Sequence, residues 1–223
     1  MLIETACVGP WMTNCYLLSP DGSSCIVVDA GIDAEPAVLR VLRRHHLTLA
    51  GVMATHGHID HIGDAATLAN RAEVPLWLHS ADDYMMTTPS AGLGPDSVAV
   101  LTEILGADSL PAPTTRGDLA GVDQVEVGGL TFGVHEAPGH TPGSVILTFD
   151  DEGQQTALCG DVIFANSVGR TDMPGGDPVA MAATLADLRT WDQHIRLLPG
   201  HGPATTVGRE RTVNPYLRWE GII

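Results

Sequence analysis

The densest group of potential metal ligands in this chain lies in one short run, Thr55-His56-Gly57-His58-Ile59-Asp60-His61. The run follows Leu49–Ala54, an apolar segment that is typical of a buried strand. Because side chains alternate along an extended chain, His56, His58 and Asp60 should point the same way, whereas His61 begins the following helix. Four ligands this close together in the sequence cannot all reach one ion. The run therefore predicts two adjacent metal ions.

Three further candidate ligands lie beside glycines, just past predicted strands. His140 follows the strand 130–136, Asp161 follows the strand 156–159, and His201 follows the strand 196–199. Strands that end at one edge of a sheet sandwich can deliver such side chains to one place. The complete predicted ligand set is His56, His58, Asp60, His61, His140, Asp161 and His201. These nitrogen and oxygen donors suit two divalent ions, zinc first, with iron or manganese as alternatives.

Two aspartates of this set are predicted to act in catalysis as well as in binding. A carboxylate can bridge two ions through its two oxygens, and Asp161 is the natural bridge. Two ions about 3.5–4 Å apart can share a hydroxide whose parent water has a pKa near 7, and Asp60 and Asp161 would orient it. Asp29 follows the strand 25–28 and is either a hydrogen-bond partner of a ligand imidazole or a simple turn residue.

The remaining histidines favour a structural interpretation. His45 and His46 lie at the expected end of a helix, where a partial positive charge is favourable. His79, His135 and His194 have no ligand-like neighbours and are expected on the surface or in the core. An alternative is that all ten histidines are helix caps and core residues. That alternative does not explain why seven potential ligands, five histidines and two aspartates, lie just past predicted strands.

The elements that must position these side chains form two similar halves rich in strands. In the first half, the strands 2–8, 15–18 and 25–28 read as an antiparallel meander, followed by a helix at 34–46 with Asp33 as its N-cap. A second helix is expected at 62–71 and a short strand at 76–79. The segment 80–119 is a long connection with helices near 81–86 and 97–105. The second half has strands at 125–127, 130–136, 144–149, 156–159 and 196–199, a helix at 179–190 and a helical tail at 207–219 broken near Pro215. We expect a single domain spanning 1–223.

Composition excludes several function classes. The formal net charge is −16, and all 11 basic residues are arginine. So acidic a chain repels phosphate backbones and anionic membranes, which argues against nucleic-acid and membrane partners, and the lack of lysine excludes a Schiff base. The four cysteines show no CxxC spacing and are expected to be buried free thiols. With no signal peptide and no spanning segment, the expected location is cytoplasmic.

The run 55–61 together with His140, Asp161 and His201, in that order, resembles the metallo-β-lactamase superfamily over essentially the whole chain. The resemblance implies an α/β (α+β) fold, a four-layer αββα sandwich with the site at one edge. It also implies that His56, His58 and His140 hold the first metal. Asp60, His61 and His201 would hold the second, with Asp161 between the two.

The segment Ser167–Asp177 narrows the resemblance to one branch. It is similar to the Gly-Arg-x-Asp-Leu-Pro-Gly-Gly loop of small bacterial glyoxalase II-like (hydroxyacylglutathione hydrolase-like) enzymes that lack a C-terminal helical domain, with Met173 in place of leucine. This implies Arg170 and Tyr216 as candidate substrate contacts, although Arg170 could equally pin a turn by pairing with Asp172. True β-lactamases of this fold commonly have a cysteine ligand or an altered second site. The thiol carrier is left open between glutathione, mycothiol and another thiol.

The expected function is hydrolysis of a small-molecule thioester, of the 2-hydroxyacyl-thiol type, by a metal-bridging hydroxide. The first metal would polarise the carbonyl, and a thiolate, with a pKa near 8.5, can leave without a strong general acid. The alternatives are an iron-dependent persulfide dioxygenase, a lactonase and a non-catalytic metal-binding protein. The last is the least consistent with a ligand set that leaves coordination positions open.

Overall fold

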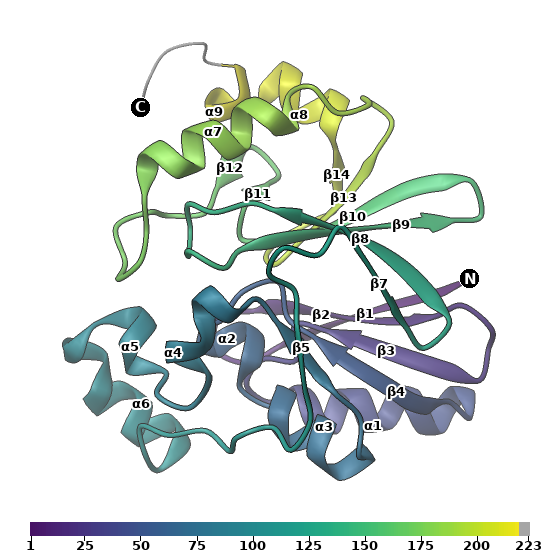
Figure 1. Ribbon diagram of the computed structural model, residues 1–223, viewed down its shortest axis with the longest axis vertical. Coiled ribbons are helices and arrows are strands. Elements are labelled where there is room, and N and C mark those ends of the chain that lie inside the picture. Colours follow the sequence, from purple (N-terminus) through teal and green to yellow (C-terminus); the bar gives the residue numbers. More distant parts are fainter. Residues whose placement is uncertain (219–223) are drawn as a thin grey trace.

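Two six-stranded sheets face each other in the computed structural model, which describes residues 1–218, and helices cover the outer face of each sheet (Figure 1). In spatial order, the first sheet consists of β1 (Leu2–Val8), β2 (Thr13–Ser19), β3 (Ser24–Val28), β4 (Thr48–Met53), β5 (Leu76–Leu78) and β6 (Arg116–Asp118). The second consists of β14 (Thr205–Thr206), β13 (Arg196–Pro199), β10 (Gln154–Gly160), β9 (Val145–Asp151), β8 (Leu130–Glu136) and β7 (Gln124–Val127). The predicted αββα sandwich is confirmed.

The helices fall into three groups along the chain. On the first sheet lie α1 (Ala34–His45) and α3 (Ala65–Ala72), and on the second lie α7 (Pro178–Leu188), α8 (Val207–Val213) and α9 (Pro215–Arg218) (Figure 1). Between β5 and β6 the chain forms η1 (Ser80–Asp82), α4 (Asp83–Met86), α5 (Ser90–Leu93), η2 (Pro95–Ser97) and α6 (Val98–Leu105). The short helix α2 (Ile59–Ile62) follows β4, and a small hairpin pairs β11 (Ile163–Phe164) with β12 (Ser167–Val168).

Alternation along the strands divides the core into layers. In β2, Tyr16 and Leu18 face the second sheet and pack with Phe132 and Leu158. The intervening Cys15 and Leu17 face the other way, into the cluster under the first sheet's helices. A third cluster lies between the second sheet and α7 to α9. Burial of these alternating apolar faces holds the two sheets in register, so that their strand ends meet at a common edge.

Strand directions agree with the expected meander. β1, β2 and β3 are antiparallel, and β3 to β6 are parallel. In the second sheet β7 to β10 are antiparallel and β10 is parallel to β13. As a result, the chain leaves four strands at the same edge of the sandwich, namely β3, β4, β10 and β13.

Some local predictions are wrong, and a distant contact explains each. Asp33 occupies the N-cap position of α1, as predicted, but it has a left-handed φ of 62° and makes no side-chain cap bond. Instead, the backbone amide of Glu35 donates to the Asp64 carboxylate at 2.8 Å. The single helix expected at 62–71 is divided into α2 and α3 at Gly63, where an added Cβ would lie 2.8 Å from the backbone nitrogen of Ile32. Neither contact has a local signature in the sequence.

The connection 80–119 contains its two predicted helical segments and also two elements that were not predicted, α5 and β6. The helical tail is confirmed with its break before Pro215, while Trp219 lies outside the described residues. All four cysteines are free, but Cys7 is exposed on the edge strand β1 rather than buried. Among the described residues, no helix combines the length and apolar character needed to cross a bilayer.

Candidate metal centre

The seven predicted ligands converge at the common strand edge. His56, His58 and His140, here called the histidine triad, place their ligand atoms within 4.8 Å of one another, and so do Asp60, His61 and His201, here called the mixed triad. Asp161 forms a third such group with His56 and His61. The run that follows β4 supplies four of these residues, and the other three follow β8, β10 and β13.

The histidine triad is compact and buried. Its imidazole rings lie 4.6–4.9 Å apart between centroids, with each ring nearly perpendicular to the others. His58 Nδ1 is 2.8 Å from His140 Nε2. No ring of the triad is more than 3% exposed. Three imidazoles at this spacing present nitrogen atoms to one common point.

Backbone and hydroxyl partners determine which nitrogen of a ring faces the site. His140 Nδ1 lies 2.7 Å from the carbonyl oxygen of Arg170, which can only accept, so Nδ1 carries the proton and Nε2 faces the site. His56 Nδ1 lies 3.2 Å from Thr55 Oγ1, whose hydroxyl donates to Asp29. His56 Nε2 therefore also points inward with its lone pair. Such partners are typical of metal-binding histidines.

The mixed triad combines carboxylates with imidazoles. His201 Nε2 lies 3.1 Å from Asp60 Oδ2 and 3.5 Å from Asp161 Oδ2. His61 Nε2 lies 3.3 Å from Asp161 Oδ1. The side chain of His201 is 26% exposed, unlike the buried rings of the histidine triad. This triad therefore faces the opening of the site.

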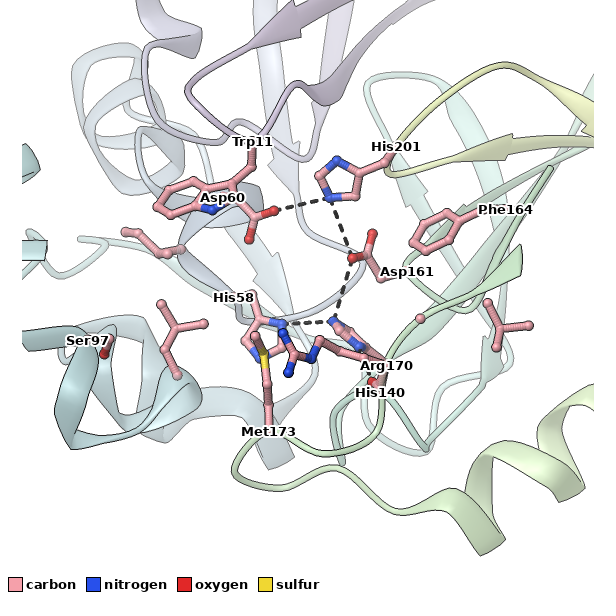
Figure 2. A pocket seen from close by; sticks show the side chains of 14 residues that line it. Trp11, His58, Asp60, Ser97, His140, Asp161, Phe164, Arg170, Met173 and His201 are labelled. Carbon is pink, nitrogen blue, oxygen red and sulfur yellow. Dashed lines mark hydrogen bonds and ion pairs between the residues drawn. The ribbon is translucent and has the colours of Figure 1, made fainter. Parts of the chain in front are cut away.

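Asp161 contacts both triads. Besides the two histidines of the mixed triad, its carboxylate lies 3.6 Å from His140 Nε2. Figure 2 shows the chain of contacts from Asp60 through His201 and Asp161 to His140 and His58. The Asp161 carboxylate therefore lies between the two triads.

Several buried atoms of the centre have no hydrogen-bond partner among the described residues. They include His56 Nε2, together with His61 Nε2 and Asp161 Oδ1, which lie 3.3 Å apart without hydrogen-bond geometry. An unpartnered buried polar atom is costly, and native structures rarely keep several together. Divalent cations among these nitrogen and oxygen atoms would satisfy them, so the residues fit metal ions.

The two triads bind protons very differently. Burial first, and then repulsion by His140, lowers the pKa of His58 to about 4. Burial and the neighbouring imidazoles also hold the pKa of His56 well below its usual value. Both rings are neutral at pH 7, the form that binds a metal.

Carboxylates reverse this direction in the mixed triad. Burial works against a charged ring at His201, but hydrogen bonds with Asp161 and Asp60 raise its pKa to about 9. Burial likewise opposes charge at His61, yet Asp60, Asp29 and Asp161 raise its pKa well above the usual value. Burial would raise the pKa of Asp161, but His61 outweighs it and holds that pKa well below the usual range. Without a metal, this triad retains protons at neutral pH.

Asp29 lies behind the mixed triad, as one of its two predicted roles requires. It follows β3 and is 1% exposed. Its Oδ2 lies 3.0 Å from His61 Nδ1, and its Oδ1 accepts from the backbone amide of Thr55 at 2.8 Å. The carboxylate therefore connects the start of the ligand run to a ligand ring.

Asp82 has a similar position behind the histidine triad, and sequence analysis missed it. This fully buried carboxylate accepts from the backbone amides of Gly57 at 2.8 Å and Gly143 at 2.7 Å. It also accepts from the Thr141 hydroxyl at 2.7 Å. A Cβ on either glycine would lie under 3.0 Å from Asp82 atoms. The only signal in the sequence is that glycines flank the ligands in both loops.

The loop of His201 is held by β2. The backbone amide of Asn14 donates to Gly200 O at 2.7 Å. The Tyr16 hydroxyl and the Asn14 side-chain amide donate to Pro199 O at 2.7 and 3.0 Å. These contacts join the first sheet to the end of β13 in the second.

A pocket of about 610 Å³ opens beside the ligands. Apart from candidate ligands, it is lined by Trp11, Ile59, Leu93, Ser97, Phe164, Val168, Gly169, Arg170 and Met173. Arg170 thus lies in the pocket wall, and it pairs with Asp172 at 2.6 Å. Tyr216 lines a neighbouring smaller cavity that shares Arg170. The structure therefore places only one of the two candidate substrate contacts in the pocket beside the ligands.

Comparisons with known proteins agree with this fold. A family model described as the Metallo-beta-lactamase superfamily matches residues 8–207. An uncharacterized protein of Mycobacterium tuberculosis is 35% identical over 100% of this chain and 99% of its own length. The hydroxyacylglutathione hydrolase GloC of Haemophilus influenzae is 29% identical over 97% of this chain and 98% of its own.

Two solved structures extend the comparison. The B3 metallo-beta-lactamase BLEG-1 is 31% identical, with a TM-score of 0.81 over 97% of this chain and 99% of its own. The protein TTHA1623, solved in a di-iron-bound form, is 31% identical, with a TM-score of 0.77 over 96% of this chain and 100% of its own.

Proposed function

The chain belongs to the metallo-beta-lactamase superfamily, and from this premise we propose that it is a metal-dependent hydrolase that cleaves small-molecule thioesters of the 2-hydroxyacyl type. The ligand cluster supports metal-dependent hydrolysis. The similarity to a hydroxyacylglutathione hydrolase over nearly the whole length of both chains supports the choice of thioester.

The observation that carries the choice of thioester is the pocket wall. Within the described part of the chain, and apart from the candidate ligands, that wall has no side chain with the pKa of a general acid. The Ser97 hydroxyl donates to Gly94 O at 2.6 Å, and Arg170 holds its protons too tightly. An amine leaving group would need a proton as the bond breaks, whereas a thiolate leaves without one.

The two triads and Asp161 would hold two divalent ions, which we propose to be zinc, with iron or manganese as alternatives. When bound, such ions lower the pKa of a water toward 7 and polarise a carbonyl oxygen. The carboxylate of Asp161, between the triads, would accept a hydrogen bond from the attacking water, and Asp60 would fix its orientation from the side of the opening. The apolar pocket wall would exclude competing water.

The test is thioester hydrolysis after controlled metal loading. Metal-free protein is prepared with a chelator, reloaded with zinc, iron or manganese, and assayed with lactoyl and other acyl thioesters while metal content is measured. We expect turnover that requires about two ions per chain and is lost on chelation. If fully loaded protein hydrolyses no thioester, the proposal fails.

Hydrolysis of a β-lactam is the second candidate, because the BLEG-1 lactamase is similar in both sequence and fold. A chromogenic β-lactam in the same assay separates the two, and a larger kcat/KM for it than for every thioester would favour the lactamase. Oxygen consumption with a persulfide, or turnover of a homoserine lactone, would identify a dioxygenase or a lactonase. Binding of metal with no turnover in any arm would identify a non-catalytic protein.

A further inference from the structure

Large apolar side chains surround the candidate ligands at the pocket (Figure 2). They are Trp11, Ile59, Leu93, Phe164, Val168 and Met173. They come from four separate parts of the chain: the β1–β2 turn, α2, α5 and the segment from β11 to the 169–176 loop. A metal centre that binds only the reacting carbonyl does not need such a wall. The wall therefore indicates that the group attached to that carbonyl is apolar.

The apolar surface continues past the pocket wall to its rim. Trp11 is 40% exposed, and the adjacent Met12 is 65% exposed with a left-handed backbone, φ 59°. Val98, directly after the wall residue Ser97, is 39% exposed. Exposed apolar side chains gathered at a cavity mouth usually mark a ligand or partner site. Trp11 itself lines the pocket, whose volume of about 610 Å³ is larger than a two- or three-carbon acyl group fills.

The pocket has little positive charge that could bind an anionic group. Arg170 is the only arginine among the described residues that line it. Its Nε and Nη2 donate to the two carboxylate oxygens of Asp172 at 2.6 and 2.7 Å, a paired fork geometry that uses the guanidinium's charge locally. The net charge of −16 adds long-range repulsion of anions. The charge of bound ions would be partly balanced by Asp60 and Asp161 and directed at the reacting carbonyl.

We propose that the 2-hydroxyacyl group of the thioester substrate carries an apolar chain of medium length, and that the thiol has no net charge. This inference rests on the proposed thioesterase function and specifies its substrate class. The reaction remains simple hydrolysis: water adds to the carbonyl carbon, the carbon–sulfur bond breaks, and a carboxylic acid and a thiol are released. The apolar chain lies along the wall from Leu93 and Ile59 toward Trp11.

A series of acyl N-acetylcysteamine thioesters, from acetyl to decanoyl, tests the acyl side with the metal-loaded protein. Each methylene that enters the pocket should raise kcat/KM about three- to fourfold until the wall is covered. Lactoylglutathione, whose carrier is anionic, should be a poorer substrate than the octanoyl compound. A flat or falling series, or a preference for lactoylglutathione, overturns this inference while thioester hydrolysis stands. No turnover of any thioester overturns the proposed function instead, and this inference with it.

Matched variants locate the effect. Leu93→Ala and Trp11→Ala should reduce the gain per methylene, while Val213→Ala, which shortens an exposed side chain on α8 that does not line the pocket, should leave the series unchanged. Asp172→Asn frees Arg170 and should raise kcat/KM for lactoylglutathione by up to about fivefold, as expected for an exposed pair. Glu126→Gln removes an equal charge on β7 and should not change it. If Leu93→Ala and Val213→Ala behave alike, the wall does not bind the chain and the inference fails.

Discussion

The histidine triad and the mixed triad lie at the same sheet edge, but their side chains and their supporting contacts differ. The histidine triad uses three buried rings, and Asp82 holds two of its loops through backbone amides. The mixed triad uses carboxylates and a partly exposed ring, with Asp29 behind it in direct contact with a ligand. Hydrogen bonds from loop backbone amides thus position the histidine triad, whereas contacts between carboxylates and imidazoles position the mixed triad.

This difference has a consequence for protons. A cation that enters the histidine triad meets rings that are already neutral, because burial lowers the pKa of His56 and His58. A cation that enters the mixed triad must displace protons from His201 and His61, whose pKa values are raised. Asp161, which contacts both triads, couples them. The four predictions below test whether the two triads behave as two distinct sites.

The largest effect is expected from Asp161→Ala, because it removes the side chain that contacts both triads. Loss of a residue behind a metal ligand typically costs 10- to 100-fold in activity, and loss of a shared ligand should cost more than about 100-fold. Metal content of purified protein should fall at both sites. Thermal unfolding of the metal-free variant is the control for folding. A variant with two tightly bound ions and near-normal activity would contradict the bridging role.

The pH dependence of metal binding should separate the triads next. The pKa of His201 is raised to about 9, so its proton is present at pH 6 and must leave when an ion binds. Affinity of the mixed triad should therefore increase about tenfold per pH unit for each proton released, between about pH 6 and pH 8. The pKa of His58 is about 4, so His58 should contribute almost no slope in that window.

The measurement is a competition titration against a chromophoric chelator at several pH values. The raised pKa of His201 also predicts how the stability of the metal-free protein depends on pH. A raised histidine pKa stabilises the fold fully below about pH 6.5, and this contribution is lost as pH rises through about 9. Equal pH slopes for the two ions would mean that the carboxylates do not distinguish the triads.

A third effect is expected from Asp82→Asn. The amide keeps the shape of the carboxylate but cannot accept from Gly57, Gly143 and Thr141 together. Affinity of the histidine triad should fall about 10- to 100-fold, while that of the mixed triad changes little. The control is Asp83→Asn at the neighbouring position, whose carboxylate pairs with Arg116 at the surface. Equal weakening at both triads would show that Asp82 supports only the overall fold.

Asp82 also shows where prediction from the sequence ends. The ligands could be found because they follow predicted strands and five of the seven adjoin a glycine, so the local pattern carries the information. The partners of Asp82 lie 25, 59 and 61 residues away, and two of them are backbone amides, which have no sequence signature. In the sequence, Asp82 falls within the helix expected near 81–86. Strand periodicity predicted two strand-rich halves and the family resemblance implied the sandwich, whereas α5 and β6, short and largely without periodicity, were not predicted.

The smallest effect is expected from Tyr16→Phe, which tests whether the sheet-to-sheet contact positions the mixed triad. The Tyr16 hydroxyl donates to Pro199 O at 2.7 Å, two residues before His201, but Asn14 donates to the same oxygen. The carbonyl therefore keeps one partner, and the free energy of unfolding should fall by only about 0.5–1.5 kcal/mol. Affinity of the mixed triad should fall less than tenfold and that of the histidine triad not at all.

Both affinities are measured by the same chelator competition, with Phe149→Leu as a control that perturbs the core between the sheets away from β13. If Tyr16→Phe and the control weaken the mixed triad equally, general core packing rather than this hydrogen bond holds the His201 loop.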